Sequence, residues 1–134
     1  MSVCIIFLAF SACLTPAIFS KSINQNVPIH VIGQMRLDIP EKKYEEFKQI
    51  TTELFSSTIK KDNPLHYTCN RDIYDQNLFV WNEEWESYIA LQKHLNAPHF
   101  KKWYSYAKKY QVGDLNVIYA PTSEFDTLGD EKGI

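Results

Sequence analysis

The chain has 134 residues, of which 22% are charged and 14% aromatic, and its formal net charge is -2. This composition is typical of a globular protein that is long enough for one domain with a core, and it excludes a largely disordered chain. The lysines are interleaved with acidic residues, so no basic field is available and we expect no binding to nucleic acid.

The first 22 residues are predicted to be a secretory signal peptide. Residues 1–20 contain no charged side chain, and most of this segment is apolar. The apolar run is shorter than the about 20 residues of a membrane-spanning helix, and Ser20 and Ser22 suit a cleavage site. We therefore expect export to the periplasm or the medium, with membrane contact only through an uncleaved N-terminal segment. A cytosolic protein is the alternative, because the usual basic start of a signal peptide is missing.

The remaining chain alternates between strand and helix patterns. After a linker at 23–28, residues 29–37 alternate between two faces and predict a strand. Apolar side chains spaced by three and four residues predict a helix over 41–61, opened by Pro40. The later predicted elements are hairpin strands at 65–72 and 77–85, helices at 86–96 and 97–110, a last strand at 112–120, and a tail at 121–134.

This order of elements, over residues 29–120, is that of an α+β ferredoxin-like split βαβ sandwich. Residues 78–81 are all apolar, which indicates a strand that is covered on both faces. The predicted helices cover one face of such a sheet, so a second copy of the chain is the simplest cover for the other. We expect a homodimer of the dimeric α/β-barrel type.

Two histidines, His94 and His99, lie five residues apart with Pro98 between them. Five residues turn an α-helix by about 500°, which leaves the two side chains about 140° apart, and the proline breaks the helix. No third ligand lies nearby at a familiar spacing, so we expect no metal site. His94 is interpreted as an inward polar group and His99 as part of the corner between two helices.

The same stretch resembles the signature of antibiotic-biosynthesis monooxygenase (ABM) domains, which combines a Glu two residues before a Trp with a helix ending in His-x-x-x-x-His-Phe. The matching residues are Glu83, Trp85, Leu91, His94, Pro98, His99 and Phe100. Residues 65–72 also resemble the family's Leu-x-Tyr-x-x-x-Arg-Asp strand. The sequence departs from the family at Asn63 and Pro64, where Gly-Cys is usual, and we expect this change to shape a turn.

Within the family, the chain is most similar to small quinol monooxygenases. The resemblance implies a dimer of ferredoxin-like barrels that oxygenates a hydroquinone or polycyclic phenol with O₂, without metal, flavin or haem. A phenolate is electron-rich enough to reduce O₂ by one electron directly. Such a reaction needs a base of near-neutral pKa, a few hydrogen-bond donors and an aromatic-lined pocket that excludes water.

His94 is the expected proton acceptor, because imidazole titrates near neutral pH, and His66 is the second choice. Glu83 either orients a histidine or is a buried structural carboxylate, and Trp85 either belongs to the core or lines the pocket. The substrate-binding candidates are Gln34, Tyr67, Glu83, Trp85, His99 and Tyr104.

Other functions are compatible with the same fold, because a fold does not fix a function. One alternative is the isomerisation of a small hydroxy-ketone, and another is a non-enzymatic dimeric module that binds a ligand. Haem degradation is disfavoured, since Met35, His94 and Tyr104 stand where haem-degrading relatives use an Asn and a Trp/His pair.

Overall fold

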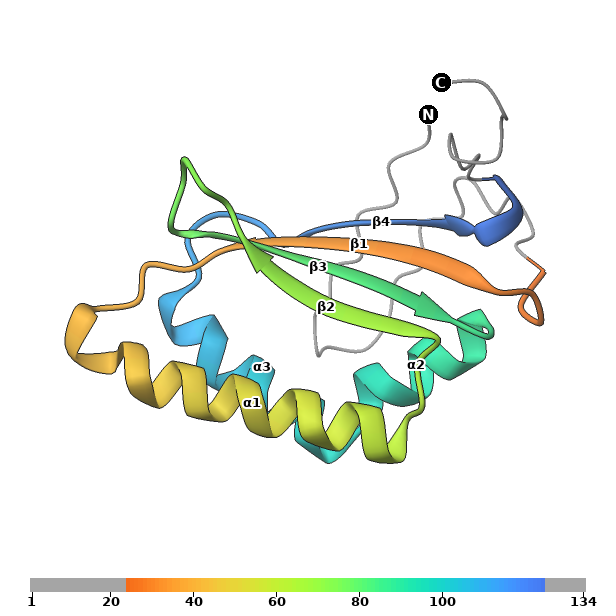
Figure 1. Cartoon of the computed structure of the whole chain (residues 1–134), viewed down its shortest axis with the longest axis horizontal. Helices are drawn as coiled ribbons and strands as arrows, with labels where there is room; N and C mark the ends of the chain where they lie inside the picture. The colour runs from red at the N-terminus through yellow and green to blue at the C-terminus, as the bar shows by residue number, and fades with distance from the viewer. Residues whose placement is uncertain (1–23, 125–134) are drawn as a thin grey trace, which may run out of the picture.

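The computed structural model describes residues 24–124 (Figure 1). The predicted signal peptide at 1–22 lies outside the described residues, as does the tail beyond residue 124. Within residues 24–124, no helix is long and apolar enough to cross a membrane.

The elements follow one another in the predicted order of strands and helices. They are β1 (Ile29–Arg36), α1 (Tyr44–Lys61), β2 (His66–Arg71), β3 (Leu78–Trp85), α2 (Tyr88–Asn96), α3 (Pro98–Ala107) and β4 (Asn116–Pro121), with short 3₁₀ helices at Glu41–Lys43, Lys108–Tyr110 and Thr122–Glu124.

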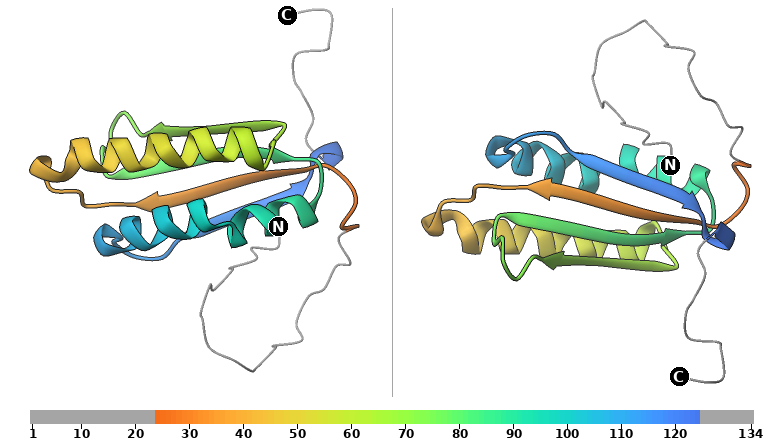
Figure 2. Two further views of the ribbon diagram at one scale, coloured as in Figure 1. Left: turned by 90° about the horizontal axis from the view of Figure 1, so that it is seen from below. Right: turned by 90° about the horizontal axis from the view of Figure 1, so that it is seen from above.

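The four strands form one antiparallel sheet in the order β2-β3-β1-β4. All three α-helices lie on one face of this sheet (Figure 1). Seen from the helix side, α1 runs along the β2 and β3 half, and α2 and α3 run along the β1 and β4 half (Figure 2). The other face carries none of the described helices (Figure 2). This arrangement confirms the predicted α+β ferredoxin-like class.

The core lies between the sheet and the helices. Every second side chain of β3 is buried, as are alternate side chains of β1, because successive side chains of a strand point to opposite faces. The apolar run at 78–81 is thus divided between the faces: Phe79 and Trp81 are buried against the helices, while Leu78 and Val80 are half-buried on the other face. The helices contribute the buried residues Phe47, Leu54, Leu91, Trp103 and Ala107.

Two turns at helix ends determine how the helices meet. Asn63, just after α1, has φ 51°, a left-handed conformation that favours Gly or Asn, so the predicted turn is present. Between α2 and α3, Ala97 is extended with ψ 145°, as expected for a residue before proline, and Pro98 occupies the first turn of α3. The chain therefore changes direction between His94 and His99.

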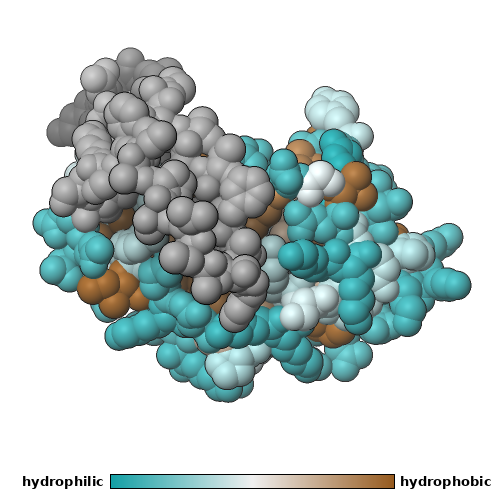
Figure 3. Space-filling view, turned by 180° about the vertical axis from the view of Figure 1, so that it is seen from behind, coloured by the Kyte–Doolittle hydropathy of each residue, from teal (hydrophilic) through white to brown (hydrophobic). Residues whose placement is uncertain are grey.

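The predicted last strand begins too early. Gly113 has φ 73° and turns the chain, and Val112 instead donates its backbone N–H to the carbonyl of Arg36 at 2.9 Å. β4 starts only at Asn116 and continues to Pro121, which pairs with Ile29. Seen from behind, the described surface is mostly hydrophilic, with small hydrophobic patches (Figure 3).

Candidate functional site

A cavity lies between the sheet and helices α2 and α3. The space that the centres of water molecules could occupy in it is about 70 Å³, several times the roughly 10–15 Å³ that one water needs. Aromatic and aliphatic side chains form most of its wall, with one carboxylate and two phenols among them. The lining residues are Val31, Gly33, Met35, Tyr67, Trp81, Glu83, Leu91, Leu95, Phe100, Trp103, Tyr104, Leu115 and Val117.

Strand register determines which side chains meet in the cavity. Glu83 pairs with Tyr67 on one side and with Val31 on the other, so the carboxylate and the phenol are direct neighbours on the helix-facing side of the sheet. In the next row Gly33 pairs with Trp81. A Cβ atom at Gly33 would be 3.7 Å from the Trp81 Cβ, which is ordinary contact. The missing side chain therefore leaves space in the cavity floor.

Glu83 is the titratable carboxylate of this cavity. It is 8% exposed, and the Trp85 indole Nε1–H donates to its Oε2 at 2.8 Å. Burial raises the pKa of Glu83 to about 7, because desolvation disfavours the charged form and outweighs the opposing Trp85 hydrogen bond. The indole thus holds the carboxylate in place. The alternative that Glu83 orients a histidine finds no support, because His94 and His99 bond to Asp62 instead.

Tyr67 supplies a hydroxyl beside this carboxylate. The residue is 7% exposed, and its buried OH lies near the Thr58 hydroxyl without forming a hydrogen bond of ordinary geometry. Burial and then the negative charge of Glu83 raise the pKa of Tyr67 well above its usual range, so the phenol remains protonated. It can donate a hydrogen bond to an oxygen atom of a ligand, since a buried OH without a partner favours finding one.

His94 and Trp85 lie behind the cavity wall and are not among its lining residues. Both are almost fully buried, and their rings stack with centroids 4.8 Å apart. The rings of Tyr67 and Phe100, which do line the cavity, contact His94 with centroids 5.5 Å and 4.9 Å away. Trp85 is therefore a core residue, and the position of His94 does not favour its expected role as the base.

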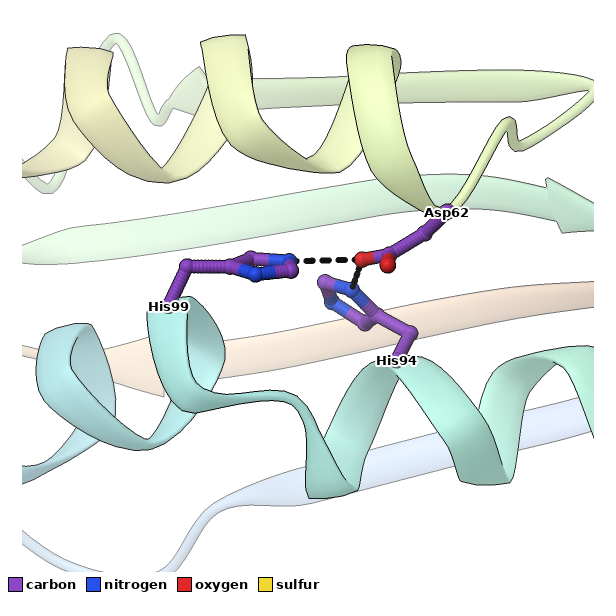
Figure 4. Close-up of side chains that lie close together, drawn as sticks. All are labelled: Asp62, His94 and His99. Atoms are coloured by element: carbon purple, nitrogen blue, oxygen red, sulfur yellow. Dashed lines mark hydrogen bonds and ion pairs between the residues drawn. The ribbon is translucent and has the colours of Figure 1, made fainter.

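His94 is held by a carboxylate at the end of α1. Its Nδ1–H donates to Asp62 Oδ2 at 2.7 Å, and the His99 Nε2–H donates to the same oxygen at 2.6 Å (Figure 4). Burial lowers the pKa of His94, although its hydrogen bond to Asp62 and the Asp62 charge act in the opposite direction. We name these three residues the Asp62 cluster.

The Asp62 cluster corrects the expectation that the two histidines stay apart without a third ligand. That expectation took the 140° separation from a continuous helix and counted the break at Pro98 as a further obstacle. The break instead brings the two rings together, because the extended Ala97 redirects the chain and both rings point at the C-terminus of α1. Asp62 was missed because it seemed only to end the first helix. One weak signal was available: a carboxylate at a helix C-terminus faces the negative end of the helix dipole, which favours a compensating interaction with a donor such as an imidazole N–H.

The remaining predicted residues are divided between the two faces of the sheet. Tyr104 lines the cavity, with its ring stacked on Phe100 at a centroid distance of 5.9 Å. His66 and Gln34 lie on strand positions of the helix-free face, away from the cavity. Thr68 Oγ1 lies 3.3 Å from the His66 ring nitrogen Nε2, and Gln34 Oε1 accepts a hydrogen bond from Asn116 at 3.4 Å.

Solved structures share this fold. A candidate antibiotic biosynthesis monooxygenase of Caulobacter crescentus CB15 is 18% identical with a TM-score of 0.65, covering 73% of this chain and 92% of that one. A structure of an antibiotic biosynthesis monooxygenase is 24% identical with a TM-score of 0.62, covering 70% and 97%. A conserved protein of Methanosarcina mazei Go1 is 18% identical with a TM-score of 0.62, covering 72% and 94%.

The sequence was also compared with curated proteins and with models of protein families. No match is found among curated proteins. The family model for antibiotic biosynthesis monooxygenase matches residues 28–106, a segment that runs from β1 through most of α3 and includes Glu83, Tyr67 and the Asp62 cluster. Since this match extends over more than half of the sequence, the chain belongs to the antibiotic biosynthesis monooxygenase family.

Proposed function

We propose that this protein oxidises a hydroquinone or polycyclic phenol with O₂, without an organic cofactor, inside the cavity between the sheet and helices α2 and α3. One observation carries the proposal: a buried carboxylate with a pKa of about 7 lines an otherwise aromatic and aliphatic cavity, beside a phenol whose OH forms no hydrogen bond of ordinary geometry with a described residue. Family membership makes oxidation the reaction class to test first.

Glu83 is the proton acceptor in this proposal, in place of His94. A general base is most effective when its pKa lies near the working pH, and Glu83 meets this condition while lining the cavity. Taking the phenolic proton neutralises the buried carboxylate and creates an electron-rich phenolate. Tyr67 donates its O–H to the oxygen of that phenolate, so the developing charge has a hydrogen-bond donor in a site with little water.

The proposed reaction balances without an added reductant. A naphthohydroquinone and one O₂ yield a hydroxynaphthoquinone and one water. The ring carbon gains one oxygen atom, and the second oxygen atom leaves as water with two hydrogens from the substrate. The phenolate transfers one electron to O₂, the resulting radicals combine at the ring carbon, and loss of water forms the carbonyl. The substrate therefore supplies all four electrons.

We also propose that a second copy of the chain covers the helix-free face of the sheet. This face presents Ile32, Val80 and Ile118 from three strands, and Ile118 is 46% exposed. Apolar side chains on one open sheet face favour burial against a matching surface. Light scattering on the purified protein tests this: we expect a dimer, and Ile118→Lys is expected to shift it toward monomer.

The test of the reaction is oxygen consumption by the metal-stripped protein with a panel of naphthohydroquinones, after subtraction of autoxidation. We expect saturable uptake, and with ¹⁸O₂ one labelled oxygen in the quinone product. Glu83→Gln should lower the rate by about 10²–10⁴-fold, the usual contribution of a general base. Glu84→Gln is the matched control, because the neighbouring residue points to the opposite face of the sheet.

Other outcomes of the oxygen-uptake test distinguish the alternative functions and the alternative base. Uptake that is lost in His94→Gln but kept in Glu83→Gln would return the role of base to the histidine. No uptake with any hydroquinone would contradict the oxygenase proposal. Interconversion of hydroxy-ketones would then identify an isomerase, and saturable ligand binding without turnover would identify a binding module.

A further inference from the structure

We propose that Asp62, His94 and His99 bind one divalent transition-metal ion, such as Zn²⁺, at the corner where α1, α2 and α3 meet. The site is separate from the cavity of the proposed reaction, because Tyr67 and Phe100 stand between His94 and the cavity. The inference does not depend on the proposed function.

The three ligand atoms converge on one position. Asp62 Oδ2, His94 Nδ1 and His99 Nε2 all lie within 4.8 Å of one another. Around a tetrahedral zinc ion with bonds of about 2.0–2.2 Å, ligand atoms are about 3.4 Å apart. The two N···O distances are now 2.7 Å and 2.6 Å, so the carboxylate oxygen has to withdraw by about 1 Å to admit the ion. The two ring nitrogens lie within 4.8 Å of each other, so they have to approach by up to about 1.4 Å, which side-chain rotation of His99 can supply.

The ligand set selects the class of metal. Two imidazoles and one carboxylate suit zinc, cobalt, iron and nickel, whereas magnesium and calcium prefer ligand sets made of oxygen atoms. Three protein ligands leave at least one coordination position for water or a small anion. The side chains of Asp62 and His99 are 13% and 11% exposed, so an ion can reach the site from solvent, while the third ligand, His94, is fully buried.

The protonation of His94 also suits a metal ligand. Its Nδ1 now carries the proton that Asp62 accepts, and its buried Nε2 has no hydrogen-bond partner among the described residues. Moving the proton to Nε2 breaks no hydrogen bond at that atom and frees the Nδ1 lone pair for the ion. Without a cation, that lone pair would face the carboxylate oxygen directly, which is repulsive.

The experiment titrates Co²⁺ into the tag-free, metal-stripped full chain and records the visible absorption of the ion, with no substrate present. We expect one Co²⁺ per chain with micromolar or tighter affinity, displacement by Zn²⁺, and no displacement by Mg²⁺. Saturating Zn²⁺ should raise the melting temperature by at least about 5 °C. In NMR spectra, Zn²⁺ should shift the imidazole signals of His94 and His99.

The variants distinguish this site from adventitious binding. His99→Gln and Asp62→Asn keep side chains that can form hydrogen bonds at the corner, and each should weaken Co²⁺ binding by at least about tenfold. His66→Gln removes an exposed histidine on the other face of the sheet and should leave binding unchanged. Absence of saturable binding to the folded wild type would overturn the proposal, as would equal affinity in the two cluster variants. The Asp62 cluster would then serve only to connect the end of α1 to α2 and α3 by hydrogen bonds.

Discussion

Replacing Glu83 by Gln is expected to abolish most turnover and, at the same time, to stabilise the protein above pH 7. Gln keeps an oxygen that can accept the Trp85 indole N–H, now bound at 2.8 Å, and it removes the charge that the cavity desolvates. A residue conserved for packing would lose stability on replacement. A residue kept for its chemistry can be held at a cost to stability.

The magnitude follows from the two pKa values of this carboxyl. Burial raises its pKa from the ordinary 4.5 to about 7 in the folded protein. At pH values between these two pKa values, the folded state binds more protons than the unfolded state. The free energy of unfolding therefore decreases as pH rises. One pKa unit corresponds to about 1.4 kcal/mol. As pH rises from 5 to 8, the raised pKa of Glu83 therefore lowers the free energy of unfolding of the wild type by about 2.5 kcal/mol. Gln, which does not titrate, is free of this cost.

The assay is urea denaturation of the wild type and Glu83→Gln at pH 5 and pH 8. The difference in unfolding free energy between the two proteins should shift by about 2–3 kcal/mol in favour of the variant as pH rises. Glu84→Gln, on the opposite face of β3, gives the background pH dependence. In parallel, wild-type turnover should rise with pH up to about 7, because the base must be ionised to accept a proton.

Two results would refute this reasoning. If the two proteins lose stability in parallel between pH 5 and pH 8, Glu83 does not have a raised pKa. If Glu83→Gln retains full turnover while its pH dependence of stability changes as expected, the carboxylate is buried but is not the base. The stability measurement therefore remains informative even when no substrate is known.

Substitutions at four further positions test other parts of the structure. Gly33→Val should raise KM at least about tenfold without lowering the melting temperature, because its methyl groups enter the cavity while valine suits a strand. Asp62→Ala should lower the free energy of unfolding by about 2–3 kcal/mol in urea denaturation, since two imidazole N–H groups lose their acceptor. Asn63→Val should cost about 1–2 kcal/mol in the same assay, whereas Asn63→Gly should be neutral, because φ is 51°. His66→Ala should leave turnover unchanged, because this exposed residue lies on the helix-free face.

Local sequence patterns were sufficient to predict the elements and their order. The alternation over 29–37 and the three- and four-residue spacing over 41–61 match the periods of a strand and a helix. The face that each element buries can therefore be predicted from its own residues. The exception was the start of β4, where Gly113 turns the chain. A strand pattern cannot show that the backbone N–H of Val112 donates to the carbonyl of Arg36 before the turn at Gly113.

The candidate site depended on contacts that no local pattern encodes. Glu83 and Tyr67 are 16 positions apart in the sequence, and only the register between β2 and β3 makes them neighbours. His66 looked equivalent to Tyr67 as a polar strand residue, but the same register turns it to the opposite face. A shift of one residue in the pairing would exchange the two.

The sequence by itself determined the class of fold, the family and most of the polar residues that could act, although it did not single out Asp62. Only the tertiary structure decided which of them meet. It placed Glu83 in a desolvated cavity, where burial moves its pKa toward neutrality, and it moved His94 behind the wall against Asp62. The physical reason is that desolvation and proximity are properties of the space around a side chain, and that space is built by residues far away in the chain.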